Sequence, residues 1–173
     1  LDVDLSDWYR LAAGDARLGP LAERFRGMKP PRFPDVFEAL ANAFACQQLS
    51  LEVGLELLNR LAARCGTPGA FPRPAEIARL RPASLLALGF STQKARAILS
   101  LARGVERRAL DLEALRAMED ASAHAQLIAL HGVGRWTAEY VLLRGLGRLN
   151  VFPGDDVGAQ KRLARWLERR APL

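Results

Sequence analysis

Residues 127–156 read LIALHGVGRWTAEYVLLRGLGRLNVFPGDD, and they are the most informative stretch of the chain. Two glycines, Gly132 and Gly134, stand in a short turn between apolar segments. Glycine tolerates positive φ and has no Cβ, so the backbone can reverse sharply there and let another group approach closely. An isolated GxG is usually only a tight turn between helices. Here the apolar residues on both sides predict a helix-hairpin-helix over residues 121–145, which favours DNA binding.

The helix after this turn is expected to point its first backbone N–H groups, and the positive end of its dipole, toward the glycines. This arrangement binds anions, and a DNA phosphate is the expected one. The predicted phosphate contacts come from Gly132, Gly134, Arg135 and Thr137, the last two through their side chains. The predicted ligands of a monovalent cation, Na⁺ or K⁺, shared with that phosphate are the backbone carbonyls of Ile128, Leu130 and Val133.

The composition agrees with a nucleic-acid partner. The chain has 173 residues, half of them hydrophobic, which is enough for one domain or two small lobes. Its formal net charge is +6, and residues 91–173 hold 14 basic and 9 acidic side chains. A positive surface attracts polyanions, so DNA, RNA or an anionic membrane is the expected partner. Solvated arginines on an ordinary surface would give the same composition.

The cysteines and the N-terminus indicate the compartment. Cys46 lies in an apolar helical pattern and Cys65 just before Gly66, so neither belongs to a disulfide framework or a spaced metal site. A reducing, intracellular setting is expected. No apolar run approaches the length of a membrane span, and the N-terminus is acidic, which disfavours insertion and secretion. The chain begins with Leu1 rather than Met, which suggests a trimmed fragment.

Hydrophobic spacing is helical almost throughout, and no alternating β-branched run predicts a strand. Asp35 and Ser50 are the predicted N-caps of the helices DVFEALANAFACQQ and LEVGLELLNRLAAR, with a break at Gln47, Gln48 and Leu49. Further helices are predicted at FPRPAEIARL and RPASLLALG, over residues 92–108, 111–118 and 121–130, after the hairpin, and over residues 157–170.

The predicted fold is therefore all-α, a two-lobed helical bundle that contains the helix-hairpin-helix and a Gly/Pro-Asp loop. Residues 1–34 are predicted to be an irregular N-terminal arm or linker, because MKPPRFP ends this region and proline disfavours helix in the residue before it. Residues 35–173 are predicted to form the helical core.

Residues from about 33 to 170 resemble the helix-hairpin-helix DNA glycosylase superfamily, and are most similar to its alkylpurine branch, the bacterial 3-methyladenine DNA glycosylase II type. The resemblance rests on QQLS, FPRPAEIA, LLALGFSTQKARAIL and, most specifically, GVGRWTAEYVLLR followed by VFPGDD. It implies an enzyme that flips alkylated purines such as 3-methyladenine and 7-methylguanine out of damaged double-stranded DNA and removes them. It also implies a monomer in the bacterial cytoplasm, associated with the nucleoid.

Asp156, in the loop of residues 150–156, matches the catalytic aspartate of that family, twenty residues beyond Trp136. A carboxylate at a helix start stays negative, so it could stabilise an oxocarbenium-like sugar and orient the attacking water. Aspartate before a helix is more often only an N-cap. For the neighbouring Asp155 we predict a capping or structural role, with Arg144 as its expected partner.

Trp136 indicates the reaction subclass. In relatives that also cut the sugar-phosphate backbone, a lysine in this position forms a Schiff base with the sugar, which tryptophan cannot do. The three lysines, Lys29, Lys94 and Lys161, all lie outside the hairpin. The resemblance therefore implies a monofunctional glycosylase without lyase activity.

Tyr140 follows Trp136 by one helical turn, so the two rings share a face and are predicted to line the base pocket. Alkylated purines are cationic and bind aromatic faces by stacking and cation–π contacts. The alternative is that both rings are ordinary core aromatics.

The helix break resembles the position of the family's wedge, the side chain that fills the gap left by the flipped nucleotide. Gln48 is the first candidate and Gln47 the second, although the pair could be merely a polar helix end. Lys94 is a further predicted phosphate ligand, as is the basic stripe formed by Lys161, Arg162, Arg165 and Arg169. A solvated helix face explains these cations equally well.

The chain departs from some relatives. It has no four cysteines beyond Asp156, so no iron-sulfur cluster is expected, and no cofactor is required. Relatives usually continue into further helices that add an aromatic side chain to the pocket, so the C-terminal part is predicted to be truncated. Two alternatives stay open: a non-catalytic helix-hairpin-helix DNA-binding module, and a glycosylase for deaminated or oxidised bases.

Overall fold

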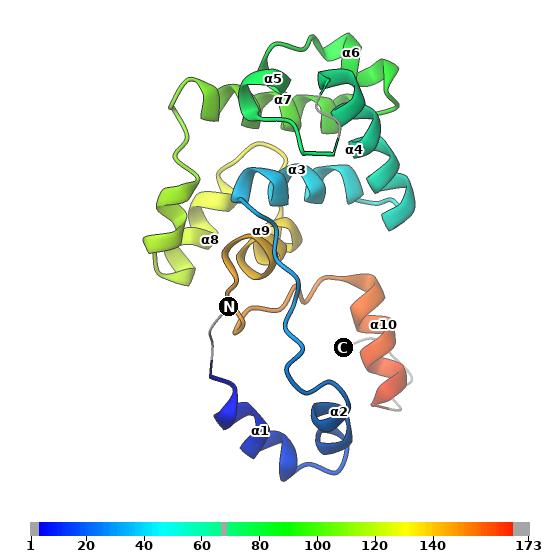
Figure 1. Cartoon of the computed structure of the whole chain (residues 1–173), viewed down its shortest axis with the longest axis vertical. Coiled ribbons are helices and arrows are strands. Elements are labelled where there is room, and N and C mark those ends of the chain that lie inside the picture. Colours follow the sequence, from blue (N-terminus) through cyan, green and yellow to red (C-terminus); the bar gives the residue numbers. More distant parts are fainter. Residues whose placement is uncertain (1–3, 67–68, 168–173) are drawn as a thin grey trace. The chain divides into compact units, whose positions relative to one another are not determined.

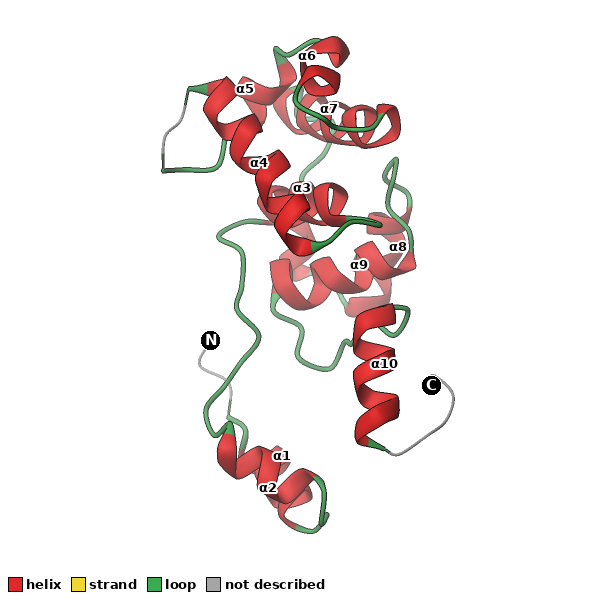
Figure 2. Ribbon diagram, turned by 90° about the vertical axis from the view of Figure 1, so that its right-hand side faces the viewer, coloured by secondary structure: helices red, strands yellow, loops and turns green. Residues whose placement is uncertain are grey.

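The computed structural model describes residues 4–66 and 69–167, and this part of the chain contains helices and no strand (Figure 1 and Figure 2). The all-α prediction is confirmed. In chain order the elements are α1 (Ser6–Ala13), α2 (Leu18–Arg24), α3 (Val36–Cys46), α4 (Leu51–Cys65), α5 (Pro74–Ala78), α6 (Pro82–Ala87), α7 (Thr92–Glu106), the 3₁₀ helix η1 (Glu113–Ala117), α8 (Asp120–Ile128), α9 (Arg135–Val141), the π-helix η2 (Leu142–Leu146) and α10 (Val157–Trp166). Within the same described ranges, no helix combines the length and the apolar character that a membrane crossing requires.

The chain forms two compact units, Leu1–Pro31 and Arg32–Leu173. The first unit contains α1 and α2, so the prediction of an irregular opening region is wrong. Here the backbone N–H of Gly27 donates to the Tyr9 hydroxyl at 2.7 Å. Pro20 does not prevent α2, because it lies in the first turn, where its missing N–H would have no partner inside the helix.

Helix α3 is the centre of the second unit. Its residues are buried on nearly every side, since the sequence is apolar around the whole helix. It packs against α4 and α7 on one side and against α9 and η2 on the other (Figure 1). The Asp35 carboxylate accepts a hydrogen bond from the Glu38 N–H at 2.7 Å, which confirms the predicted N-cap. Helix α3 thus joins the lobe of α4–α7 to the lobe of α8, α9 and η2.

The other predicted helix limits are mostly confirmed. The Ser50 hydroxyl accepts a hydrogen bond from the Val53 N–H at 3.4 Å and caps α4. This helix ends at Gly66, whose φ is +77°. Pro74 and Pro82 occupy the first turns of α5 and α6.

Two predicted helices differ from those observed. Residues 111–118 contain only the short 3₁₀ helix η1, whose start is fixed by Asp111: its carboxylate accepts hydrogen bonds from the N–H groups of Glu113 and Ala114, each at 3.1 Å. The last helix, α10, runs to Trp166, and its predicted end at residue 170 lies outside the described residues.

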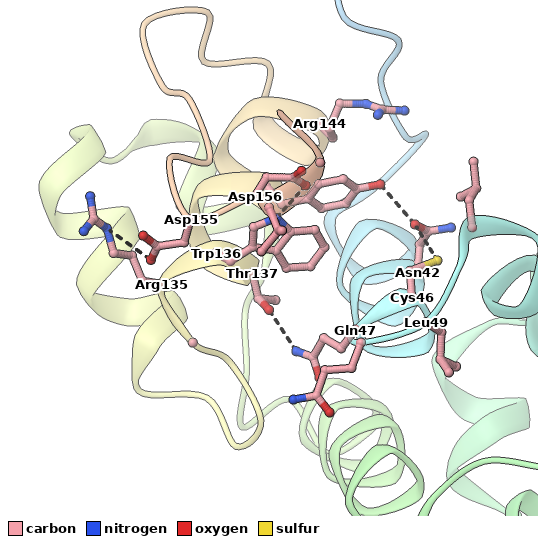
Figure 3. Close-up of a pocket in the computed structure, with 16 residues that line it drawn as sticks. Asn42, Cys46, Gln47, Leu49, Arg135, Trp136, Thr137, Arg144, Asp155 and Asp156 are labelled. Atoms are coloured by element: carbon pink, nitrogen blue, oxygen red, sulfur yellow. Dashed lines mark hydrogen bonds and ion pairs between the residues drawn. The ribbon is translucent and has the colours of Figure 1, made fainter. Parts of the chain in front are cut away.

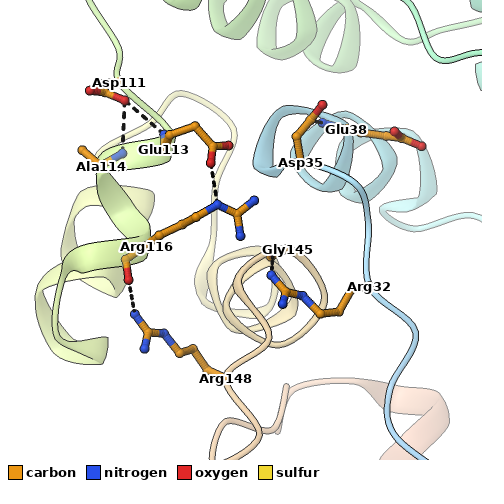
Figure 4. Close-up of polar contacts among 9 residues, drawn as sticks. All are labelled: Arg32, Asp35, Glu38, Asp111, Glu113, Ala114, Arg116, Gly145 and Arg148. Carbon is orange, nitrogen blue, oxygen red and sulfur yellow. Dashed lines mark hydrogen bonds and ion pairs between the residues drawn. The ribbon is translucent and has the colours of Figure 1, made fainter. Parts of the chain in front are cut away.

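Two arginines attach distant segments to the region of η2 (Figure 4). The Arg32 guanidinium donates to the Gly145 carbonyl at 3.2 Å. The Arg148 guanidinium donates to the carbonyls of Arg116 at 3.0 Å and Met118 at 2.8 Å. The segment that enters α3 and the segment that enters α8 are therefore both fixed at the end of the hairpin's second helix, from which the loop to α10 departs.

Candidate active site

A cavity of about 740 Å³ opens where the C-terminal end of α3, the loop to α4, the start of α9 and the start of α10 meet (Figure 3). Its lining includes Asn42 from α3, Trp136 and Tyr140 from α9, and Asp156 from the loop before α10. The predicted catalytic and aromatic residues, separated by up to twenty positions in the sequence, therefore border the same cavity.

Asp156 connects α10 to α9. Its Oδ1 accepts a hydrogen bond from the Ala159 N–H at 2.8 Å and caps α10. Its Oδ2 accepts a hydrogen bond from the indole Nε1–H of Trp136 at 3.0 Å. An ionised carboxylate accepts such bonds with both oxygens. The two contacts hold the carboxylate at the cavity wall in one orientation.

The two aromatic rings are stacked. The centroids of Trp136 and Tyr140 lie 5.1 Å apart, with an interplanar angle of 21°. The Tyr140 hydroxyl donates to the Asn42 side-chain carbonyl at 3.0 Å, and Asn42 is buried, with 6% of its surface exposed. Burial raises the pKa of Tyr140, so the hydroxyl keeps its proton and remains a donor.

These contacts form a continuous series from Asn42 through Tyr140 and Trp136 to Asp156. It links α3, α9 and α10 by two hydrogen bonds and one ring stack. Because Asn42 lies on the buried central helix α3, the series connects the carboxylate of Asp156 to a helix that is almost entirely buried.

The hairpin glycines have different surroundings. Gly132 has a φ of +85°, and a Cβ there would lie 2.8 Å from the Cβ of Ala97 on α7, so the turn needs glycine for both conformation and space. Gly134 is the N-cap of α9, and a Cβ there would meet no atom within 4 Å. The backbone at Gly134 is therefore open to a group that approaches from outside.

The two glutamines at the end of α3 have different surroundings. The Gln47 amide donates to the Gly132 carbonyl at 3.1 Å and to the Thr137 hydroxyl at 2.9 Å, so this side chain is tied to the hairpin. Gln48 is exposed and has a φ of +56°, which is uncommon outside glycine. Of the two glutamines, Gln48 is the one whose side chain forms no hydrogen bond with the described residues at the edge of the cavity.

Thr137 differs from its predicted side-chain role. Only 2% of its surface is exposed, and its hydroxyl accepts the hydrogen bond from Gln47. The side chain therefore lies inside the protein, and a phosphate could reach only the backbone N–H of this residue.

Lys94 also differs. Its ammonium donates to the carbonyls of Ala45 and Gln47, both at 2.7 Å, and so satisfies the last carbonyls of α3. Partial burial lowers its pKa. The structure thus gives Lys94 a helix-capping role in place of the predicted phosphate contact, because a helix that ends inside the protein needs a donor there.

Asp155 does not have the predicted capping role. Asp156, and not Asp155, caps α10. The ion pair of Asp155 is with Arg135, at 3.9 Å, instead of the expected Arg144. Arg135 is exposed and also pairs with Glu139 at 2.9 Å, and this ion pair raises its pKa.

The guanidinium of Arg144 lies over two rings, 5.4 Å from the centroid of Phe33 and 5.6 Å from that of Tyr140. Arg144 also lines the cavity. Its position therefore places a positive charge beside the aromatic pair, where cation–π attraction holds it.

Sequence reasoning did not include Asn42 and Cys46 in the site. Asn42 was detectable as the one amide side chain within the apolar run ALANAFAC, where a buried amide requires a partner. Cys46 lies one helical turn further along α3, and burial raises the pKa of its thiol, which favours the protonated form. Its place in the cavity wall carried no separate sequence signal.

Comparison with known proteins agrees with this geometry. The family model described as HhH-GPD superfamily base excision DNA repair protein matches residues 41–171. The chain is 34% identical to the DNA-3-methyladenine glycosylase of Bacillus subtilis, over 91% of this chain and 55% of the relative. It is 31% identical to DNA-3-methyladenine glycosylase 2 of Escherichia coli, over 90% of this chain and 60% of the relative.

A solved structure, 3-methyladenine DNA-glycosylase from Archaeoglobus fulgidus, matches with a TM-score of 0.80 and 31% identity, over 94% of this chain and 57% of that protein. This chain therefore spans little more than half the length of these relatives. Since the family match includes the hairpin, the aromatic pair and the Asp156 loop, the chain belongs to the HhH-GPD superfamily of base excision DNA repair proteins.

Proposed function

We propose that this chain is the core of a DNA glycosylase that hydrolyses the N-glycosidic bond of alkylated purines, including 3-methyladenine and 7-methylguanine. The observation that carries the proposal is the hydrogen bond from Trp136 to Asp156, which holds a carboxylate beside a stacked aromatic pair in an open cavity. The names of the similar glycosylases support this class of substrate.

The reaction begins when the damaged nucleotide leaves the base stack and its base enters the cavity. As the bond between C1′ and the base nitrogen breaks, the electron pair goes to the base, which leaves as a neutral purine, and the sugar becomes an oxocarbenium ion. The Asp156 carboxylate stabilises that positive charge and orients a water molecule toward C1′. Water supplies the new hydroxyl group at C1′, and its proton passes to the carboxylate or to solvent.

The aromatic pair supports recognition of a cationic base. Stacked rings present an electron-rich face, which attracts N-alkylated purines more strongly than neutral ones. A base that already carries a positive charge is a good leaving group, so the site needs no separate general acid. This fits a cavity in which Asp156 and Asp155 are the acidic side chains among the described lining residues.

The proposed reaction stops at base removal. A lyase step requires an amine that attacks C1′ and forms a Schiff base. Trp136 stands at the corresponding position, and none of the described residues that line the cavity is a lysine. The ammonium of Lys94 is bound to the end of α3. We therefore expect an intact abasic site as product.

The proposed substrate is damaged double-stranded DNA, bound by a monomer. The backbone at Gly132 and Gly134, with the exposed Arg135, would hold a phosphate, and Gln48 would fill the gap left by the flipped nucleotide. The open space at Gly134 and the unusual backbone conformation of Gln48 support these assignments, because both expose the chain to an approaching ligand.

We also propose a monovalent cation at the hairpin, bound by the carbonyls of Ile128, Leu130 and Val133. The Leu130 carbonyl accepts one hydrogen bond, from the Val133 N–H at 3.1 Å, and has a second lone pair. Among the described residues, no backbone N–H donates to the other two carbonyls outside regular helix. Replacing K⁺ by a bulky organic cation at constant ionic strength should weaken DNA binding several-fold; unchanged affinity would contradict the cation site.

The test of the proposed function is base release from duplex DNA that contains 7-methylguanine, comparing the chain with its Asp156→Asn variant. Asparagine preserves the shape of the side chain and removes the charge. We expect the rate of release to fall on the order of 100-fold or more, with DNA affinity largely retained. Strand breaks should appear only after alkali treatment, and borohydride should trap no covalent complex.

Three results would contradict the proposal. Equal release by both proteins would remove Asp156 from the chemistry. Strand cleavage without alkali would show a lyase. DNA binding without any base release would favour a non-catalytic helix-hairpin-helix module.

A further inference from the structure

One face of α7 carries a row of donors outside the active-site cavity. Arg96, Ser100, Arg103 and Arg107 are spaced by four, three and four residues, so they lie on the same side of the helix. Together with His131 they line a second cavity of about 470 Å³. No acidic side chain is among the described residues that line it.

This cavity lies beside the hairpin. His131 immediately precedes Gly132, and the position of a Gly132 Cβ would be 2.8 Å from the Cβ of Ala97, the neighbour of Arg96 on α7. The hairpin turn therefore packs on α7, with the active-site cavity reaching Gly134 and the second cavity reaching His131.

The arginines of this row differ in their partners. The Arg103 guanidinium donates to the carbonyls of Ala78 at 3.3 Å and Leu80 at 3.1 Å, so it is used in attaching α5 to α7. Arg96 and Arg107 are exposed, and across residues 4–66 and 69–167 neither forms an ion pair with an acidic side chain. Their charges are consequently available to an anion.

We propose that Arg96, Ser100, Arg107 and His131, here named the α7 groove, bind the DNA backbone next to the hairpin and add phosphate contacts to the one expected at Gly132 and Gly134. The proposal rests on the proposed DNA-binding function. Guanidinium groups suit phosphate oxygens because their N–H donors match them in pairs. The eleven residue steps from Arg96 to Arg107 span about 16 Å of helix, enough to follow more than one phosphate of a strand.

The test is the salt dependence of binding to duplex DNA with a stable abasic-site analogue, measured by fluorescence anisotropy. Each phosphate contact contributes about 0.9 to the slope of log K against log salt. The Arg96→Ala/Arg107→Ala double variant should reduce the slope by about 1.8 and weaken binding on the order of 10-fold or more at low salt. Neither residue lines the active-site cavity, so release of 7-methylguanine should fall only to the extent that less DNA is bound.

The matched control is Arg64→Ala/Arg79→Ala, which removes the same charge from exposed positions on α4 and at the end of α5. A slope that falls equally in both double variants indicates a general charge effect and contradicts phosphate binding by the α7 groove. A slope that is unchanged in the Arg96/Arg107 variant also contradicts it, because no phosphate contact was lost. In either case salt-sensitive binding and base release by the unchanged protein would still support the proposed function. If the unchanged protein neither binds nor releases base, both proposals fail.

Discussion

A single side chain, Asp156, has two structural roles in the proposed active site. One carboxylate oxygen caps α10, and the other accepts the hydrogen bond from Trp136. The position of the reactive group is therefore coupled to the formation of the helix that follows it. A carboxylate that is already oriented by two donors needs little rearrangement when positive charge develops on the sugar.

Replacing Trp136 by phenylalanine tests this orientation. The variant keeps an aromatic ring over Tyr140 and removes the indole N–H that holds Asp156. A hydrogen bond to a charged group contributes about 1.5–3 kcal/mol, so kcat for release of 7-methylguanine should fall about 10-fold to 100-fold, with a smaller change in KM. Single-turnover kinetics at varied protein concentration separate the two constants.

The control for that variant is Tyr140→Phe, which keeps the ring stack and removes the hydrogen bond to the buried Asn42 amide. It should lower the free energy of unfolding by about 1–3 kcal/mol, because a buried polar group loses its partner, and should change kcat less than Trp136→Phe does. Equal losses of kcat in both variants would mean that the indole N–H has no special part in positioning the carboxylate.

The hairpin combines a glycine required by packing with a glycine that leaves space. Gly132 fits its neighbours only without a Cβ, whereas Gly134 has no neighbour on its open side. The first glycine allows the turn to sit on α7, and the second keeps the backbone at the start of α9 accessible. Within one short turn, Gly132 therefore serves packing and Gly134 serves access of a ligand.

Alanine at each glycine should separate these effects. Gly132→Ala introduces a strained φ and a 2.8 Å contact, and should lower the free energy of unfolding by about 1–3 kcal/mol in urea titrations. Gly134→Ala should cost less than about 1 kcal/mol, since glycine and alanine differ modestly at an N-cap. It should nevertheless weaken DNA binding, because its Cβ would occupy the approach of the phosphate. Undiminished DNA affinity of Gly134→Ala would place the phosphate elsewhere.

Besides the hairpin, the C-terminal end of α3 shapes the active-site cavity. Lys94 satisfies its terminal carbonyls, and Gln47 ties it to the hairpin. With both contacts in place, the chain turns at Gln48 through a left-handed conformation and exposes that side chain. The helix break therefore results from contacts with α7 and α9 as well as from its own sequence.

For the whole molecule, the buried core belongs to the second unit. Its buried apolar residues extend from Val36 to Ala164, while in the first unit only Ala12 and Ala22 are buried among the described apolar residues. Burial of apolar surface is the main contribution to stability. The second unit should therefore fold without the first.

Removal of residues 1–31 should leave the helical circular dichroism, the cooperative thermal transition and the DNA affinity of the remaining residues almost unchanged. Removal of residues 1–34 is the matched comparison, because it also deletes the contacts of Arg32 with Gly145 and of Phe33 with the Arg144 carbonyl. This longer deletion should be less stable. Loss of cooperative unfolding after removal of residues 1–31 would show that the first unit contributes to the core.

Local features of the chain determined most of the helices. Caps such as Asp35 and Ser50 and first-turn prolines such as Pro74 act within three or four residues, so the sequence shows them directly. The hairpin and the family motif around Asp156 were recognisable for the same reason. Helices α1 and α2 lie outside the prediction, because the prolines of MKPPRFP disfavour helix only near themselves and not in the residues further upstream.

The roles of individual polar side chains were decided only by tertiary structure. Lys94 meets a carbonyl 49 positions away, Gln47 meets Thr137 across 90 positions, and Tyr140 meets Asn42 across 98. Sequence reasoning identifies a donor or an acceptor, whereas packing of the helices selects its partner. In the sequence, a cationic or polar residue near a binding motif therefore suggests a contact with the ligand. In the folded chain, the same side chain can instead form a hydrogen bond with a carbonyl or hydroxyl group inside the protein that would otherwise have no partner.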